Sequence, residues 1–416
     1  MRQIHTPKVS GPPTQAVTPP YDRTMRALRR VLTVGTSSNR MLRLLLVVLT
    51  IVFIVVGDLS HILFVYPFSV DLEIPLRAAQ RWVEGGEPYL ASAFTSPPGP
   101  TQPFLYPPYV LALVAPLLAL PKALVQVAWL AVCLASSVFF VRRLAFPPWM
   151  WLLVFAWPPF LEPIVGGNVQ LVLVACFAWI FWRMTPRSPL DPDDRDVSDP
   201  AEPGVRLGLV AALSSSIKVS QPQAWLYLLR HRTGGALVGA AVVGGLAMAS
   251  LAVTGFQPWF DWLSQLRRAS DPTWELGGIA IGRLVNPTLG LVVAGLSFLA
   301  ILFLVPKRRA GAWVGLLAVI GSPSLHNFGT LFLIPAMLVV RREIALIAAM
   351  VMSTTTYEGT WAGILLVSAA MVAGLRWPAF LEPTAAAEDS TAGVPSGPVG
   401  APSRVGVSRD GTVGQG

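Results

Sequence analysis

Asp71 is the residue of this chain that is best placed to do chemistry. It lies in Phe68-Ser69-Val70-Asp71-Leu72-Glu73, just beyond a long apolar run. A carboxylate held at the mouth of a membrane bundle can act as a general base on a substrate that arrives through the bilayer. A single Asp in a loop is more often only solvated, so the functional hypothesis depends on the residues around it.

Three basic side chains lie in or beside the apolar runs. Lys218 lies in an apolar run, where an unpaired charge costs roughly 3 kcal/mol, and this favours a functional or paired role. His326 lies at an expected turn, and Arg283 lies near the start of an apolar run. Both also fit a simple anchoring role at the membrane interface.

The composition places these residues in a membrane protein. Of 416 residues, 53% are hydrophobic and 13% charged, and the mean hydropathy is +0.59. Soluble domains carry roughly a quarter charged residues. Cys133 and Cys176 lie in apolar runs and the four histidines are scattered, so we expect no disulfide framework, no metal site and no cofactor.

The net charge of +9 does not indicate nucleic-acid binding, because much of it is concentrated before the first apolar run. Basic residues there fix topology and contact anionic lipid on the cytoplasmic side. The residues in question are Arg23, Arg26, Arg29, Arg30, Arg40 and Arg43.

The domain organisation follows from the apolar runs. We expect a disordered basic cytoplasmic tail over 1–40, a transmembrane domain over 41–382 and a disordered tail over 383–416. The fold class is an all-α polytopic bundle of about 10–12 spans with interfacial helices in its outer loops. The expected spans are 42–65, 105–121, 123–141, 146–163, 167–183, 206–229, 234–254, 285–305, 311–325, 328–340, 344–357 and 360–376.

This layout gives each loop a side. Residues 66–104, 184–205 and 255–284 and the turn at His326 lie outside, whereas 230–232, 307–309 and 341–342 are cytoplasmic, as the positive-inside rule favours. Residues 142–143 do not follow the rule. Residues 72–84 and 257–268 carry apolar residues on one helical face, which predicts helices along the membrane surface. Those helices could also be anchors without chemistry.

The order of the motifs resembles glycosyltransferase family 87, the polyprenyl-phosphate-dependent, mannosyltransferase-like membrane proteins with a C-type glycosyltransferase fold. The resemblance covers roughly residues 42–376. The motifs, in order, are Asp71, Gly85-Gly86-Glu87-Pro88-Tyr89, Phe104-Leu105-Tyr106-Pro107-Pro108, Gly166-Gly167-Asn168-Val169-Gln170, Ser216-Ile217-Lys218 with Pro222, Thr254-Gly255-Phe256 with Trp259 and Trp262, and Ser322-Pro323-Ser324-Leu325-His326.

Two departures from the family pattern bear on the site. The order of Asn168 and Gln170 is swapped, which weakens their expected roles. Glu73-Ile74-Pro75 follows Asp71 where an aromatic residue is commoner, and the proline is expected to kink or shorten the helix that orients Asp71.

The resemblance implies a reaction: an inverting transfer of a hexose, mannose above all, from a polyprenyl-phosphate donor to a lipid or glycan acceptor outside the plasma membrane. Asp71 would be the general base, since the acceptor hydroxyl must lose a proton as it attacks. The candidates for binding the donor phosphate or sugar are Lys218, His326, Arg283, Asn168, Gln170, Tyr89 and Tyr106. The two tyrosines also fit an interfacial aromatic belt.

Two other functions stay open. The first is a transporter or flippase of lipid-linked sugar, in which Lys218, Asp58 and Glu162 would form the transport path. The second is a non-catalytic relative that keeps the bundle. Transfer of labelled sugar by membranes would separate an enzyme from a transporter.

Overall fold

The computed structural model of the chain describes residues 36–55, 68–94, 102–144, 146, 150–184, 204–218, 221–269, 278–307, 309–354, 356–377 and 380–381. Both expected tails, apart from residues 36–40 of the first, lie outside this part of the chain, as do Asp58 and residues 185–203. Among the described residues the regular structure is helical, with one isolated antiparallel bridge between Val340 and Leu381.

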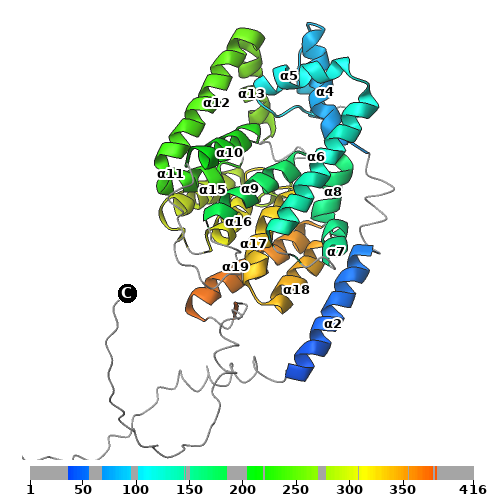
Figure 1. Ribbon diagram of the computed structural model, residues 1–416, viewed down its shortest axis with the longest axis vertical. Coiled ribbons are helices and arrows are strands. Elements are labelled where there is room, and N and C mark those ends of the chain that lie inside the picture. Colours follow the sequence, from blue (N-terminus) through cyan, green and yellow to red (C-terminus); the bar gives the residue numbers. More distant parts are fainter. Residues whose placement is uncertain are drawn as a thin grey trace, which may run out of the picture.

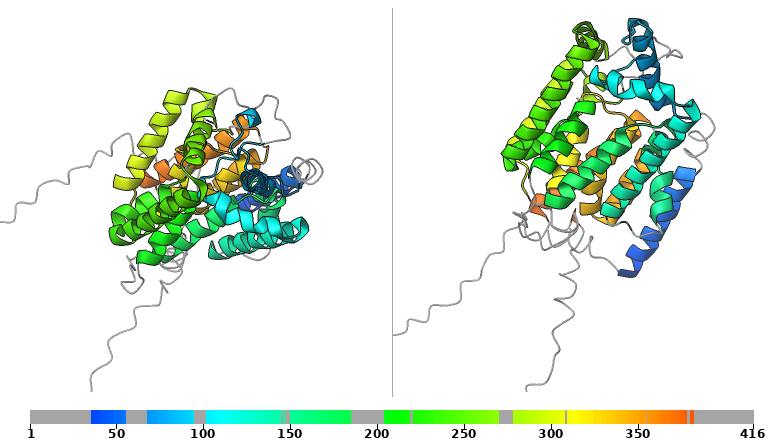
Figure 2. Two further views of the ribbon diagram at one scale, coloured as in Figure 1. Left: turned by 90° about the horizontal axis from the view of Figure 1, so that it is seen from above. Right: turned by 45° about the horizontal axis from the view of Figure 1, so that its top comes forward.

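The helices form an elongated bundle with two distinct ends (Figures 1 and 2). One end carries α4 (Val70–Val83), α5 (Tyr109–Val114) and α13 (Gln257–Ala269). The other carries α18 (Arg342–Met352), with α2 (Thr36–Val52) beside it. The 3-10 helices η2 (Ala91–Ala93) and η3 (Ala115–Ala119) flank α5 in the sequence.

Three helices are long and apolar enough to cross a membrane: α6 (Lys122–Arg143), α12 (Thr233–Thr254) and α19 (Tyr357–Arg376). Shorter apolar helices lie among them, and together they confirm the all-α membrane class. The remaining elements are α7 (Trp151–Ala156), α8 (Pro158–Gly166), α9 (Gln170–Met184), α10 (Gly204–Ile217), α11 (Gln223–His231), α14 (Ile281–Leu284), α15 (Pro287–Phe303), α16 (Ala310–Ile320), η6 (Asn327–Leu333) and α17 (Ile334–Val339).

Several expected spans are broken in the structure. The stretch 206–229 divides into α10 and α11, and Lys218 lies at the break between them rather than inside a helix. Residues 105–121 form α5 and η3, and 146–163 divide at Trp157 between α7 and α8. Prolines begin several of these pieces, because proline has no N–H for a helical hydrogen bond and favours the first turn.

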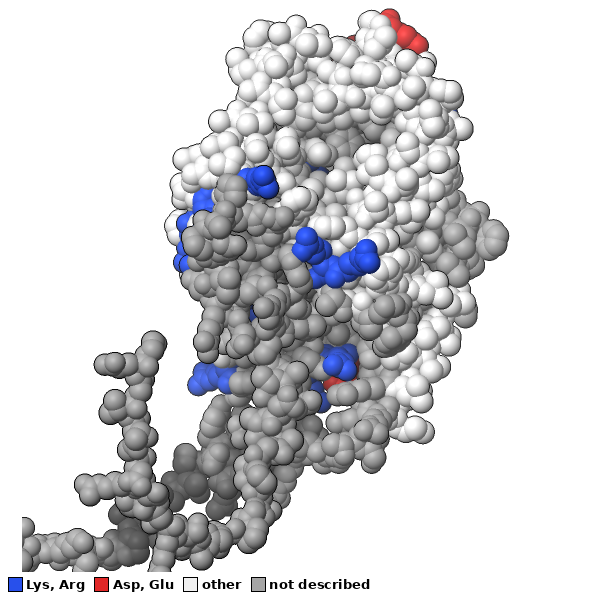
Figure 3. All heavy atoms as spheres, in the orientation of Figure 1, with Lys and Arg blue, Asp and Glu red and all other residues white. Residues whose placement is uncertain are grey.

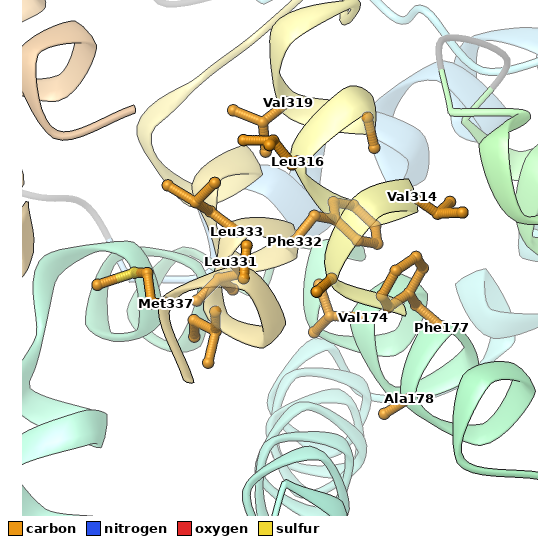
Figure 4. Close-up of a cluster of buried hydrophobic side chains, with 14 of the residues drawn as sticks. Val174, Phe177, Ala178, Val314, Leu316, Val319, Leu331, Phe332, Leu333 and Met337 are labelled. Carbon is orange, nitrogen blue, oxygen red and sulfur yellow. The ribbon is translucent and has the colours of Figure 1, made fainter. Parts of the chain in front are cut away.

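The core of the bundle is a continuous apolar cluster. It gathers side chains of α9, α16, η6 and α17, where Phe177 meets Phe332 edge-on at a centroid distance of 5.0 Å (Figure 4). In lipid, apolar area alone gives little drive to associate, so close packing and satisfied polar groups hold such helices together.

Glycines set the closest helix contact, between α10 and α12. A Cβ at Gly208 would overlap the carbonyl oxygen of Gly235, and one at Gly235 would overlap that of Gly204. Small residues let two membrane helices approach with their backbones in contact. These glycines therefore fix the position of α10, whose last residue precedes Lys218.

The helices α15 and α16 pack as an antiparallel pair, with Ser297 against Gly321. Arg283 precedes α15 and His326 follows α16, so both lie at one end of the pair. Lys307 lies in the connection at the other end, near Arg230, whose Nη1 donates to the Val305 carbonyl over 3.4 Å. Arg283 and His326 therefore lie at the opposite end of the α15–α16 pair from Lys307 and Arg230.

A second apolar cluster holds α4, α5 and α13 together. Tyr89, Phe104 and Trp262 are among its buried members. The Trp262 Nε1 donates to the Leu105 carbonyl over 3.0 Å, and the Tyr89 hydroxyl donates to the Tyr106 carbonyl over 2.8 Å. The two helices expected along the membrane surface, α4 and α13, therefore contribute side chains to one apolar cluster at one end of the bundle.

Candidate active site

Asp71 lies in the first turn of α4, which docks on the turn between α8 and α9. The Ser69 N–H donates to the Val165 carbonyl over 2.8 Å, and Ser69 itself has a positive φ of 60°. Gly167, at φ 70°, ends α8, and a Cβ there would come within 3.5 Å of Leu72. A contact of 3.5 Å is ordinary for a Cβ, so glycine is favoured here by the left-handed turn, a conformation that other residues rarely adopt.

Pro75 does not end α4, which continues to Val83, so the expected shortening is wrong. Proline lacks the N–H that would bond to the carbonyl four residues earlier. In α4 that carbonyl belongs to Asp71. The proline therefore frees the backbone at the residue of interest while leaving the helix long enough to reach the second apolar cluster.

The Asp71 carboxylate is held by Asn168. The Asn168 Nδ2 donates to Asp71 Oδ2 over 3.0 Å, and Asn168 Oδ1 accepts the Gln170 N–H over 2.8 Å. Asn168 is buried. Its oxygen is thus used at the start of α9, which leaves its amino group to point at the carboxylate. Burial raises the pKa of Asp71, and the Asn168 hydrogen bond and the Lys218 charge oppose that rise.

Lys218 approaches the segment of Asn168 and Gln170 from the break between α10 and α11. Its Nζ donates to Gln170 Oε1 over 3.0 Å and lies 5.0 Å from the centre of the Phe328 ring. Asn168 and Gln170 therefore connect the carboxylate to the ammonium group. The swapped order of these two residues does not remove them from the site: each has its own partner.

Arg283 and His326 complete a group of basic side chains. The His326 ring stacks on Phe328 at 5.1 Å between centroids, and both Lys218 and Arg283 act electrostatically on it. Burial and these two cations lower the pKa of His326 to about 3, so its imidazole is neutral at physiological pH. Within the part of the chain that the structure describes, the Arg283 Nη1 is buried without a hydrogen-bond partner.

Gly278 brings the Arg283 segment to the His326 loop. Its φ is 84°, and a Cβ would overlap the Leu325 carbonyl, which accepts the Ile279 N–H over 2.5 Å. The Trp361 Nε1 donates to the Ile279 carbonyl over 2.7 Å. The start of α19 therefore clamps this loop.

The remaining predicted residues differ in how close they lie to Asp71. Tyr106 lies near enough to Asp71 to feel its charge. Tyr89 is buried in the second apolar cluster, with its hydroxyl on the Tyr106 carbonyl and its pKa raised by burial. Glu162 on α8 interacts electrostatically with Asp71, whereas Asp58 of the alternative transport path lies outside the described residues.

Sequence reasoning missed Gln221. Its Nε2 donates to Gln170 Oε1 over 3.2 Å, beside Lys218. Gln221 stands three residues after Lys218 and next to Pro222, but nothing in its local pattern marks it. In the described part of the chain, no group of three or more His, Cys, Asp or Glu residues could hold a metal ion.

Comparison with known proteins places the chain in a family. The model of glycosyltransferase family 87 matches residues 104–320, about half of the chain. Lys218, Asn168 and Gln170 lie inside the matched range, and Asp71 and His326 lie outside it. Neither the comparison with curated proteins nor that with solved structures found a match. The chain belongs to glycosyltransferase family 87 and is a membrane glycosyltransferase.

Proposed function

We propose that this glycosyltransferase moves a hexose, mannose, from a polyprenyl-phosphate donor to a lipid or glycan acceptor. The reaction takes place on the extracytoplasmic face of the plasma membrane and inverts the anomeric carbon. Asp71 is the general base. The observation that carries the proposal is the meeting of one carboxylate with a group of basic side chains at one end of the bundle.

The carboxylate suits proton removal from an acceptor hydroxyl. Asp71 is oriented by the hydrogen bond from Asn168, and the positive charge of Lys218 acts on its carboxylate. Among the described residues, Asp71 and Lys218 form no ion pair with each other, so the carboxylate keeps an oxygen for the acceptor. A positioned base of this kind contributes about 10²- to 10⁴-fold to a rate.

The basic group suits a phosphate that leaves. In the described residues neither Lys218 nor Arg283 forms an ion pair with a carboxylate, and one nitrogen of Arg283 is buried without a partner. A phosphate would satisfy both charges, and cations that stabilise developing charge on a leaving group lower the barrier. The neutral His326 can donate one hydrogen bond there.

The orientation is supported by the distribution of charge. Lys and Arg gather on the half of the molecule away from α4 and α5 in the face that Figure 3 shows, and much of the rest is uncharged. Loops rich in Lys and Arg favour the cytoplasmic side of a membrane. Arg283 and His326 lie at the end of the α15–α16 pair opposite to Lys307. This arrangement favours an extracytoplasmic site.

The test is transfer by the purified protein in vesicles. Polyprenyl-phosphate mannose labelled in the sugar is incubated with cell-envelope lipid and glycan extracts, and labelled product is counted. We expect labelled product, and we expect its formation to require Asp71. The other product should be unlabelled polyprenyl phosphate. Movement of labelled donor across the vesicle membrane without product would instead favour the transporter.

A further inference from the structure

The orientation of two amide side chains in the site is fixed by Lys218. An ammonium group has donors only, so the atom of Gln170 that it contacts is the oxygen. The atom of Gln221 that contacts this same oxygen is then the nitrogen. Turning either amide over would place two donors or two acceptors against each other.

This orientation leaves one donor and one acceptor unused. Gln170 Nε2 and Gln221 Oε1 are both buried and have no hydrogen-bond partner among the described residues, and the Gln170 side chain is fully buried. Buried polar atoms without a partner destabilise a protein and are uncommon. Two of them on contacting side chains in one site indicate a ligand that supplies both an acceptor and a donor.

The position of the pair indicates which part of the ligand that is. Gln170 is two residues from Asn168, which holds Asp71, and it contacts Lys218 directly. The transferred sugar must lie between base and cation, because its anomeric carbon is bonded to the leaving phosphate and attacked by the acceptor oxygen. A sugar hydroxyl both accepts and donates a hydrogen bond.

We infer that Gln170 and Gln221 together bind hydroxyl groups of the transferred sugar and so contribute to the choice of hexose. This inference rests on the proposed function and adds Gln221 to the site. A site that hydrogen-bonds a hydroxyl discriminates against ligands in which that hydroxyl is absent or displaced, because its own polar atoms then stay unpaired.

The test compares two lipids that differ only in the sugar: a short-chain polyprenyl-phosphate mannose and the same polyprenyl phosphate without sugar. Their affinities are measured for the detergent-purified protein. Gln221→Met should weaken binding of the sugar-bearing lipid about tenfold, the loss of one hydrogen bond, and leave the sugar-free lipid unchanged. Lys218→Gln should weaken binding of both lipids.

A second variant and a control accompany it. Gln221→Asn keeps an amide but shortens its reach, and should show the same sugar-dependent loss if Gln221→Met does not fold. Ser214→Ala is the control, because Ser214 lines the same small pocket as Gln221 while its hydroxyl bonds within its own helix, to Ala211 at 3.0 Å. It should bind both lipids normally.

The outcomes separate the two proposals. If neither lipid binds the unaltered protein, the proposed function is wrong. If both bind it equally, or if the Gln221 variants affect both lipids to the same degree or neither, the sugar-binding role of the amide pair is wrong while the phosphate site stands.

Discussion

At the scale of single residues, the site distinguishes two acids that are close in the sequence. Among the described residues, Asp71 contacts an amide and no cation directly, whereas Glu73 forms ion pairs with Lys122 over 2.5 Å and Arg77 over 2.6 Å. The hydrogen bond from Lys122 holds the pKa of Glu73 below its usual range. A carboxylate used in two ion pairs is a poor base, so Asp71 is the better candidate.

The substitution Asp71→Asn tests the base. The amide keeps the shape but cannot take a proton, so transfer should fall by roughly two to four orders of magnitude while donor and acceptor still bind. Asp71→Glu should retain more activity than Asp71→Asn, although less than the unaltered enzyme, because its longer arm displaces the oxygen. Initial rates of labelled product at saturating donor measure this.

Glu73→Gln is the matched control. It removes a partly exposed charge and its ion pairs, which contribute little when solvated, so turnover should change only slightly. Near-normal turnover of Asp71→Asn would exclude Asp71 as the base, and a collapse in Glu73→Gln would assign that role to Glu73.

The pH dependence tests the contact between Asn168 and Asp71. Asn168→Asp keeps the oxygen that accepts the Gln170 N–H but replaces the donor that faces Asp71 by a second acid. The donor lowers the pKa of Asp71, so its loss should raise that pKa. The base then needs a higher pH to ionise, and the acid limb of the kcat/KM profile should move upward. An unmoved limb in a stably folded variant would show that Asn168 does not act on the base.

At the scale of the elements, the site depends on how closely helices approach one another. The left-handed turn at Gly167 leads to Asn168, which faces α4, and α10 presents Lys218 because its glycines touch those of α12. Breaks between helices matter as much as the helices. The gap between α10 and α11 lets Lys218 turn toward α9 instead of facing lipid.

The glycine contact predicts a difference between two similar substitutions. Gly208→Ala places a methyl group on the Gly235 carbonyl and should destabilise the protein by about 1–3 kcal/mol, the usual cost of overpacking. Gly244→Ala, in the partner helix α12, meets nothing within 4 Å among the described residues and should leave the melting temperature unchanged or raise it, since alanine favours helix. Thermal unfolding in detergent measures both, and equal melting temperatures would refute tight packing of α10 on α12.

At the scale of the whole molecule, the candidate site and a second group of basic residues lie at opposite ends of the α15–α16 pair. Arg283 and His326 lie together at one end of the α15–α16 pair, and Arg230 and Lys307 lie near its other end. The second apolar cluster packs α4, α5 and α13 together at the end of the bundle that holds Asp71. The exposed Phe256 and Phe260 at the start of α13 suit a helix that contacts the lipid interface.

This polarity predicts the result of labelling from outside the cell. In a background without Cys133 and Cys176, a cysteine at the exposed Glu87 should react with a membrane-impermeant reagent. One at the exposed Lys307 should react only after permeabilisation. Activity of each single-cysteine protein controls for folding. The opposite labelling pattern would invert the topology and place the site in the cytoplasm.

The sequence by itself determined the class of the protein and named many of the residues that the structure brings together in the candidate site. Long apolar runs predict membrane helices because the transfer of each run from water to lipid depends on that run alone. The order of motifs, from the segment at Asp71 to that at His326, indicated family 87, which the family comparison confirmed. The roles of those residues remain predictions.

Tertiary structure alone decided which polar atoms meet. Asn168 contacts Asp71 across 97 residues and Lys218 contacts Gln170 across 48, and no local pattern encodes either pair. The position of Lys218 outside a helix and the unpaired amide atoms of Gln170 and Gln221 appear only once α9, α10 and α11 are packed. Apolar patterns specify that helices form, but hydrogen bonds in the site depend on how closely and at what rotation those helices pack.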